Sequence, residues 1–307
     1  MSAPGAAVPV PPGASADITR RQDEPDHLRR LLAYSHVYRV AQRWRRARAA
    51  GTLGLAAVAP LISLTVPATT DVLAAIAAGW LVLGRTVLSA LEQHTRDRAV
   101  AMQELYDTRL FHLPWNGALA GRPPIPDDIA RAARHIDDDS RYRQWYSIDL
   151  TGVSWPADVL LCQRQSMVWS RGDHRAYANT LLVAGIAWFV LGVVIALIRD
   201  LSLADYLIKL FLPTSPALLD AAELSREHLR HARAREQVLH DIDDLYELHR
   251  QDLTSTPVAA CRHVQDAAFL LRRSAPRVPS LFYRFRRTAS AADTAAGVTA
   301  LRDGPQP

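Results

Sequence analysis

Long apolar stretches alternate with strongly charged segments along this chain, and four of the stretches approach the length of a membrane-spanning helix. They cover residues 49–68, 72–91, 176–198 and 201–219. A helix needs about 20 mostly apolar residues to cross the hydrocarbon core of a bilayer. The third stretch is the most apolar, whereas the fourth contains Asp205 and Lys209 and is the weakest. The pattern predicts four transmembrane helices.

Short connections join these apolar stretches in pairs. A few residues around 67–71 separate the first stretch from the second, and Arg199 and Asp200 separate the third from the fourth. Helices joined by so few residues form antiparallel hairpins. The alternative, in which the apolar stretches are buried helices of a soluble protein, stays open chiefly for the fourth. We expect two transmembrane hairpins, at 49–92 and 176–219.

The positions of the arginines predict the orientation in the membrane. Arginines cluster before the first stretch, after the second, before the third and after the fourth, whereas the two short outer links hold only Arg199. Cytoplasmic loops of membrane proteins carry an excess of Lys and Arg. We therefore expect a multi-pass protein of the inner membrane, with both chain termini and the middle segment in the cytosol.

The polar segments show the three- and four-residue spacing of helices and no strand pattern, so the predicted fold class is an all-α membrane protein. The helix that begins in the second span has no stop signal before Pro114; at 71–113 it would be roughly 60 Å long. Shorter helices are expected after Pro126, at 140–146, at 156–175 and after Pro257. The expected cytosolic segments are a disordered tail (1–25), a juxtamembrane amphipathic helix (26–48), a helical region (93–175), further helices (220–274) and a flexible basic tail (275–307).

Composition and motifs give little support for an enzyme. The net charge is +5, and the two cysteines form neither a disulfide framework nor a zinc spacing. Glu104 and Asp107 stand one helical turn apart and His112 follows, which could contribute to a metal-dependent hydrolase. The chain lacks the HExxH, GK[ST] phosphate-loop and GxSxG motifs. We expect no catalytic residue, no metal site and no resident cofactor.

Three charged residues fall within the predicted spans: Arg85 in the second, and Asp205 and Lys209 one helical turn apart in the fourth. A charge at that depth costs at least about 2.5 kcal/mol on insertion scales, so it usually faces a partner or water. Two interpretations stay open. Arg85 pairs with Asp205 inside a closed bundle, or the three groups line a pore after oligomerisation.

Four segments carry a resemblance to a known bacterial family. They are AVAMQELYDTRLFHLPWN at 99–116, RQWY at 143–146, LLCQRQSMVWSRGDHRAYA at 160–178 and LPTSPALLDAAE at 212–223. Their order, and their places relative to the spans, resemble those in the SMODS-associating four-transmembrane effectors. One departure is that Trp169 is followed by Ser170 and Arg171, where family members often carry an acidic residue beside the tryptophan.

The resemblance implies a role in a cyclic-oligonucleotide-based anti-phage signalling system. A synthetase encoded nearby would make a cyclic di- or trinucleotide on infection. The effector would bind it, form a pore in the bilayer as a homo-oligomer and cause abortive infection. No DNA or RNA polymer is expected as a partner.

A cyclic oligonucleotide offers phosphates, base faces and base edges, which proteins bind through Arg, aromatic rings and amides. The residues of these types within the resembling segments are candidate ligand contacts. They are Gln103, Arg109, Trp115, Asn116, Arg143, Trp145, Tyr146, Gln163, Arg164 and Trp169. The competing interpretation is that they tie the cytosolic helices together.

Two other function classes stay open from the residues alone. A membrane-anchored hydrolase or nuclease would use Glu104 and Asp107. A membrane scaffold would bind a partner protein through the charged helix at 219–251, which carries apolar residues at mostly three- and four-residue spacing.

Overall fold

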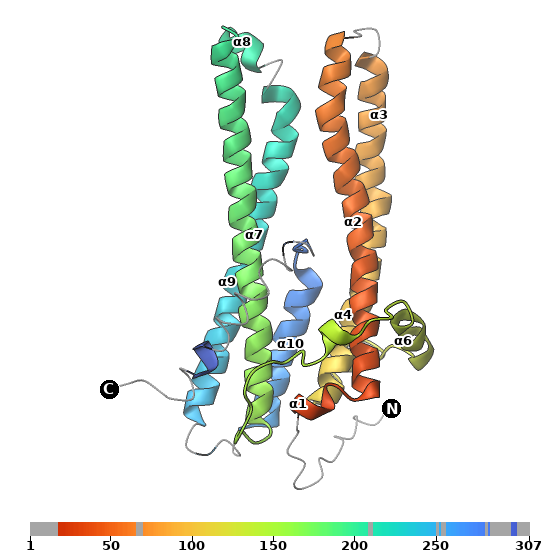
Figure 1. Cartoon of the computed structure of the whole chain (residues 1–307), viewed down its shortest axis with the longest axis vertical. Helices are drawn as coiled ribbons and strands as arrows, with labels where there is room; N and C mark the ends of the chain where they lie inside the picture. The colour runs from red at the N-terminus through yellow and green to blue at the C-terminus, as the bar shows by residue number, and fades with distance from the viewer. Residues whose placement is uncertain are drawn as a thin grey trace, which may run out of the picture. The chain divides into compact units, whose positions relative to one another are not determined.

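A computed structural model describes residues 18–65, 70–207, 211–249, 252, 256–279, 282 and 296–299 of the chain. All regular secondary structure in these residues is helical (Figure 1). The elements are α1 (Ile18–Arg21), α2 (Pro25–Thr65), α3 (Thr70–Leu83), a π-helical turn (Gly84–Leu88), α4 (Ser89–Leu110), α5 (Gly117–Ala120), α6 (Pro126–Ala133), a 3₁₀ turn (Ser140–Tyr142), α7 (Ala157–Ile198), α8 (Leu203–Tyr206), α9 (Leu212–Leu248) and α10 (Val258–Ser274). The all-α prediction is confirmed for this part of the chain.

The chain divides into two compact units. The first, here the polar unit, comprises the described parts of 1–39, 95–173 and 231–307. The second, here the apolar unit, comprises those of 40–94 and 174–230. Each division point falls inside a helix, so α2, α4, α7 and α9 contribute residues to both units.

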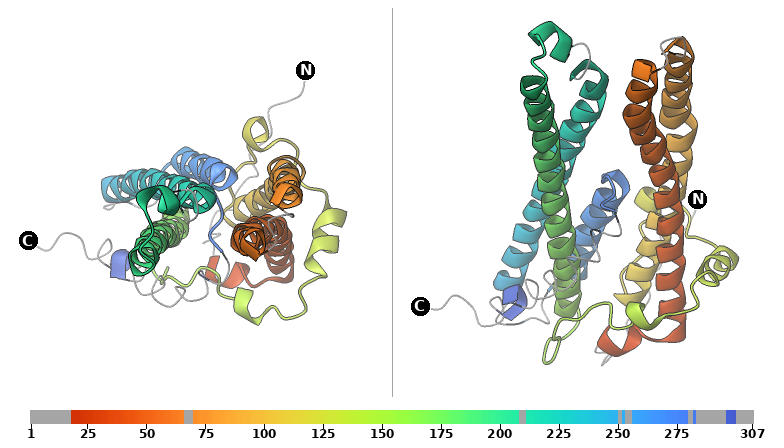
Figure 2. Two further views of the ribbon diagram at one scale, coloured as in Figure 1. Left: turned by 90° about the horizontal axis from the view of Figure 1, so that it is seen from above. Right: turned by 45° about the horizontal axis from the view of Figure 1, so that its top comes forward.

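Two helix pairs make up the apolar unit. Figures 1 and 2 both show α2 beside α3, and α7 beside α9. α2 and α3 approach closely at Gly51, where an added Cβ atom would lie 2.0 Å from the Trp80 ring. Small residues permit such close contact between membrane helices, and here the glycine leaves room for an indole.

Most large apolar side chains of this unit point away from the rest of it. Val183 is 65% exposed and Ile198 is 74% exposed, and similar exposure recurs along α3 and α7. Two helical stretches among the described residues, Ala75–Leu110 and Ala157–Ile198, have the length and apolar composition needed to cross a membrane. The predicted spans at 49–68 and 201–219 include residues 66–68 and 208–210, which lie outside the described chain. Four spans therefore stay a prediction.

Several predicted helices have different limits in the structure. The juxtamembrane helix and the first apolar stretch form one helix, α2, and α7 likewise joins 157–175 to the third stretch. The expected 71–113 helix runs from Thr70 to Leu110, with a π-helical turn at Gly84–Leu88. The predicted helix at 140–146 is wrong. Only a 3₁₀ turn forms there, because Arg143 is extended and Gln144 has a left-handed φ of 50°.

The polar unit has a conventional apolar core. Its largest fully buried side chains include Tyr106 and Phe111 of the α4 region, Leu160 and Leu161 of α7, and Ile242 of α9. Ile18 and Gln22 are also fully buried, and Gln22 exchanges hydrogen bonds with the Tyr146 backbone. Residues 18–25, predicted as part of a disordered tail, thus belong to the folded unit.

Both cysteines lie in this core. Cys162 of α7 and Cys261 of α10 are fully buried free thiols. Burial raises the pKa of Cys261 to about 12 and that of Cys162 well above its usual value.

Candidate ligand-binding region

A buried polar network joins α4 to α10 in the polar unit. Glu104 and Asp107, each 1% exposed, occupy one face of α4 because they stand three residues apart. Gln265 donates to both carboxylates, at 2.8 Å to Glu104 and 3.0 Å to Asp107. Arg262 pairs with Glu104 at 2.6 Å, and Arg272 pairs with Asp107 at 2.5 Å.

Each charge in this network is offset by an opposite one. Burial raises the pKa of the Glu104 carboxyl, and the Arg262 charge and the Gln265 hydrogen bond oppose that shift. Burial works to lower the pKa of Arg272, but the interactions with Asp107, Tyr146, Tyr38 and Glu104 together outweigh burial, and the pKa of the guanidinium is raised. Removing one partner of such a buried pair leaves an uncompensated charge, so the loss of any one member should weaken the contact of α4 with α10.

The hydrolase interpretation gains no support from this arrangement. Glu104 and Asp107 are shielded from solvent and engaged by arginine and glutamine side chains. No group of three His, Cys, Asp or Glu side chains placed to hold a metal ion occurs among the described residues. The two carboxylates serve as attachment points for α10.

Three of the predicted ligand residues contribute to the same network. The Tyr146 hydroxyl donates to Asp107 at 3.3 Å. The Gln163 amide donates to the Cys261 carbonyl at 2.9 Å and to Gln265 at 3.2 Å. Asn116 donates to Asp266 at 3.0 Å and accepts from the backbone of α5. These side chains are therefore used in packing within the polar unit.

The other predicted ligand residues are dispersed over the polar unit. Arg164 pairs with Asp243 of α9 at 2.7 Å, and Arg143 pairs with Asp139 four residues earlier at 2.9 Å. The remaining members differ from one another in their contacts and burial. Gln103 accepts from the Tyr38 hydroxyl at 2.8 Å, Trp115 donates to the Gly121 carbonyl at 2.8 Å, Trp145 packs against the core, Arg109 is exposed, and Trp169 is half-buried.

The charged residues of the predicted spans have different partners from those expected. Arg85, in the π-helical turn, pairs with Asp220 of α9 at 3.6 Å, and not with Asp205, its partner in one of the two open interpretations. Asp205 instead accepts from the Ser202 hydroxyl at 2.8 Å in the first turn of α8. Lys209 lies outside the described residues. The Arg85–Asp220 pair joins the two helix pairs of the apolar unit.

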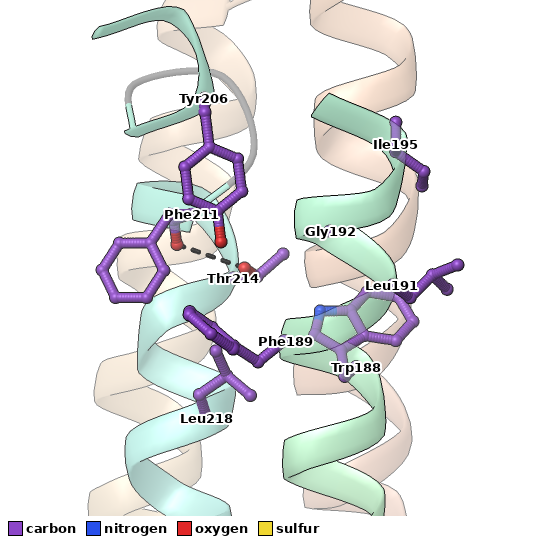
Figure 3. A pocket seen from close by; sticks show the side chains of 9 residues that line it. All are labelled: Trp188, Phe189, Leu191, Gly192, Ile195, Tyr206, Phe211, Thr214 and Leu218. Atoms are coloured by element: carbon purple, nitrogen blue, oxygen red, sulfur yellow. Dashed lines mark hydrogen bonds between the residues drawn. The ribbon is translucent and has the colours of Figure 1, made fainter. Parts of the chain in front are cut away.

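Two hollows of the described structure differ in their chemistry. A cavity of about 90 Å³ in the apolar unit is lined by α7, Tyr206 and the start of α9 (Figure 3). Trp188, Phe189 and Leu218 dominate its wall. Pockets for small-molecule ligands usually measure about 300–1,000 Å³. This cavity is too small and too apolar to hold a nucleotide.

The second hollow is large enough for a nucleotide. It measures about 530 Å³ and is lined by Arg29 of α2 and by one face of α6. Arg131 and Arg134 project from that face, but Asp127 also lines the pocket. Arg29 and Arg131 each lie within 3.3 Å of an aspartate, Asp26 and Asp128, on their own helices. Most of the positive charge of this pocket is therefore offset.

The family assignment follows from a comparison with known protein families. The model of the SMODS-associating 4TM effector domain matches residues 16–301. The chain belongs to this family. The resemblance seen in the sequence is thereby confirmed, and the 4TM effector domain spans nearly the whole chain.

A relative of this effector is a probable CBASS effector molecule of Bacillus cereus (strain VD146). The two are 25% identical over 195 residues, which cover 63% of this chain and 65% of the relative. The chain thus matches slightly less than two thirds of the relative's length. No solved structure matches the effector. Family membership supports an anti-phage role and an association with membranes.

The sequence did not reveal most residues of the effector's buried network. Arg262, Gln265 and Arg272 all lie on α10, outside the segments that carried the resemblance. A signal was present, since these residues recur at three- and seven-residue spacing on a helix whose other face is apolar. Arg235 of α9, expected only as a flank of the fourth span, is also buried.

Proposed function

We propose that this effector is a multi-pass protein of the inner membrane that binds a cyclic di- or trinucleotide. Binding leads homo-oligomers of the effector to open a pore in the bilayer, which causes abortive infection. The nucleotide comes from a synthetase encoded nearby. In this proposal the effector is not an enzyme, and it needs no metal or cofactor besides its activating ligand.

The observation that carries this proposal is the exposed apolar surface of α7. The most apolar 18-residue stretch of α7 has a mean hydropathy of 2.9, and only 6% of this stretch is buried. Trp188, Val190 and Leu191 lie within four consecutive residues and are each at least 50% exposed. Residues so close in sequence project from different sides of a helix, so several sides of α7 are apolar. A helix that is apolar all round fits hydrocarbon and not water.

Four spans with both termini in the cytosol complete the proposed topology. α2 and α9 would supply the two further crossings, because each pairs with one of the two apolar helices. The arginines at the cytosolic ends of the spans would keep the polar unit inside the cell. The family description as a 4TM effector supports the same number of crossings.

Arg85 and Asp220 offer a means of holding the resting state closed. They lie 3.6 Å apart on different helix pairs of the apolar unit. In hydrocarbon each charge would cost at least about 2.5 kcal/mol without a partner, so the pair favours the closed arrangement. In an open oligomer both groups would instead face the water of the pore.

Dye release from liposomes that contain the full-length effector tests the proposal. Cyclic di- and trinucleotides are titrated one at a time, and the linear dinucleotide of the same bases serves as the ligand control. At least one cyclic species is expected to release dye, whereas the linear form releases none. Release without nucleotide, or no release with any cyclic species, would contradict the proposal.

Arg85→Ala tests the closing pair in the same liposomes. We expect dye release without nucleotide, because Asp220 loses its partner and the resting state is destabilised. Arg98→Ala is the matched control, since Arg98 lies in the polar unit and 3.9 Å from Asp128. Equal background release from the two variants would show that Arg85 does not hold the channel closed.

A further inference from the structure

Arg235 differs from the other buried arginines of the polar unit. Arg235 is buried and the side chains of Arg164, Arg262 and Arg272 are largely buried, but each of those three lies within 2.7 Å of a carboxylate oxygen. No carboxylate in the described part of the chain pairs with Arg235. Its two terminal nitrogens donate only to the carbonyls of His231 (2.9 Å) and Leu271 (3.4 Å). Its Nε is buried without a hydrogen-bond partner among the described residues.

A second arginine also donates to a carbonyl at the C-terminal end of α10. Arg96 of α4 donates to the carbonyl of Ala275, one helical turn beyond Leu271, and its Nε is likewise buried without a described partner. Both guanidinium groups therefore approach the C-terminal end of α10. A helix C-terminus carries only about half a negative charge, so it offsets a minor part of two full positive charges.

Other positive groups increase this excess. Burial lowers the pKa of Arg235 to about 9, and the charges of Arg272 and Arg277 add to the effect. At pH 7 the group is still protonated. Asp107 pairs with Arg272, and Arg277 stacks over the Tyr38 ring, 3.3 Å from its centroid. A buried positive charge without a counterion is costly, and a bound anion would offset that cost.

Groups suited to a nucleobase lie beside these charges. Tyr38 presents its ring to Arg277 and donates its hydroxyl to the amide oxygen of Gln103. The charges of Arg277, Arg272 and Arg96 all act on Tyr38. Aromatic rings and amides recognise base faces and edges, and guanidinium groups bind phosphate oxygens. One region of the polar unit thus holds both kinds of group.

The arginine pocket between α2 and α6 is a weaker candidate, although it is open. Two of its three guanidinium groups already have aspartate partners, and a third aspartate lines its wall. Within the described residues, neither Arg96 nor Arg235 pairs with a carboxylate; both donate to backbone carbonyls. Electrostatics therefore favours the buried site over the open one.

We propose that Arg96 and Arg235 bind a phosphodiester group of the activating ligand, with Tyr38 and Gln103 placed to contact a base. This inference rests on the proposed function and assigns a site to its ligand. The segment at 275–279, which Arg96 and the Tyr38 ring hold through Ala275 and Arg277, has to move for the ligand to enter. Binding therefore acts directly on the C-terminal end of α10.

Thermal unfolding of the full-length effector in a phosphate-free maltoside detergent tests the site. The probes are cyclic GMP-AMP, cyclic di-AMP and cyclic tri-AMP, each at constant ionic strength. A ligand present at about 100 times its Kd is expected to raise the Tm by about 5 °C. Arg235→Met should reduce this shift to below about 1 °C. Arg233→Met, an exposed arginine two residues earlier on α9, should retain the full shift.

A second experiment distinguishes the phosphodiester of a nucleotide from that of a lipid headgroup. The effector is placed in nanodiscs without nucleotide, and the fraction of phosphatidylglycerol is raised. If phosphatidylglycerol raises the Tm in nanodiscs through Arg235, and nucleotides cause no Arg235-dependent shift in detergent, the site binds a lipid headgroup. If a cyclic nucleotide raises the Tm in detergent and the rise requires Arg235, the site binds the soluble nucleotide. Shifts that persist in Arg235→Met, or no shift in either arm, would overturn the site.

Arg235→Lys keeps the test decisive if the methionine variant does not fold. Lysine retains the charge but lacks the planar fork that binds two phosphate oxygens, so the Kd should rise about tenfold. Dye release separates this inference from the proposed function. Nucleotide-triggered release that is unchanged in both Arg235 variants would refute the site and leave the function standing. An Arg235-dependent Tm shift without any release would refute the function and leave the site standing.

Discussion

Replacing Arg272 with methionine should show how strongly the buried network holds α10 to α4. The change removes the guanidinium that lies 2.5 Å from Asp107 and leaves a carboxylate that is 1% exposed. Breaking a buried pair in this way costs about 3–5 kcal/mol. Gln265 and Tyr146 still donate to Asp107, at 3.0 and 3.3 Å, which favours the lower end of that range. We therefore expect a loss of about 3 kcal/mol.

The assay is thermal unfolding in detergent at pH 7, followed by circular dichroism. For a domain of 150–250 residues 1 kcal/mol shifts the Tm by about 2–4 °C. Arg272→Met should thus lower the Tm by at least about 6 °C. Adding Asp107→Asn should restore most of the loss, because the unpaired charge disappears.

Arg273→Met is the matched control on the neighbouring residue. Arg273 is 54% exposed and lies 3.9 Å from Asp97, and exposed pairs at such distances contribute little. Its Tm should stay within about 1 °C of the unmodified effector. If Arg272→Met behaves like this control, or if Asp107→Asn restores nothing, the network does not stabilise the helix contact as argued.

Two further changes test other contacts. Gly51→Val should lower the Tm by several degrees, because its Cβ would overlap the Trp80 ring and overpacking costs about 1–3 kcal/mol; Gly54→Val, with open space around its Cβ, should not. Asp158→Asn should alter the pH dependence of unfolding, since burial raises the pKa of this carboxyl to about 7. The folded state then keeps a proton that the unfolded chain releases near pH 4, so this group makes stability fall from pH 4 to 7 by up to about 4 kcal/mol.

The glycine prediction and the Asp158 prediction can each be contradicted by a specific outcome. Equal Tm values for the two glycine variants would mean that α2 and α3 do not meet at Trp80. For Asp158→Asn, urea unfolding between pH 4 and 8 should give a stability curve that is higher at pH 7, relative to pH 4, than that of the unmodified effector. Parallel curves would show that the carboxyl titrates normally in the folded state.

Local signals in the sequence predicted much of the helical organisation. Pro126 followed by two aspartates starts α6, and Pro257 precedes α10, because proline and acidic residues suit the first turn of a helix. The uninterrupted spacing after the second apolar stretch correctly indicated a long helix. The helix limits failed where backbone conformation departs from regularity without a sequence cue, as at Gln144 and in the π-helical turn.

The candidate site was harder to predict, because its contacts join residues distant in sequence. Asp107 and Arg272 are 165 residues apart, and periodicity along one helix does not show which helix it faces. Residue type alone grouped Arg143 with Gln163, although one is exposed and the other is buried. In the sequence, Arg235 resembles the other arginines beside the predicted fourth span, and only its burial in the structure distinguishes it.

The burial of both native cysteines has a practical consequence for spectroscopy. Thiol reagents react with the thiolate, and a thiol with a pKa near 12 is almost entirely protonated at neutral pH. A maleimide probe should therefore not react with Cys162 or Cys261 in the folded effector. A single cysteine introduced on an exposed helix face would then carry the label alone, and helix motions could be followed by fluorescence or spin resonance without first replacing the native thiols.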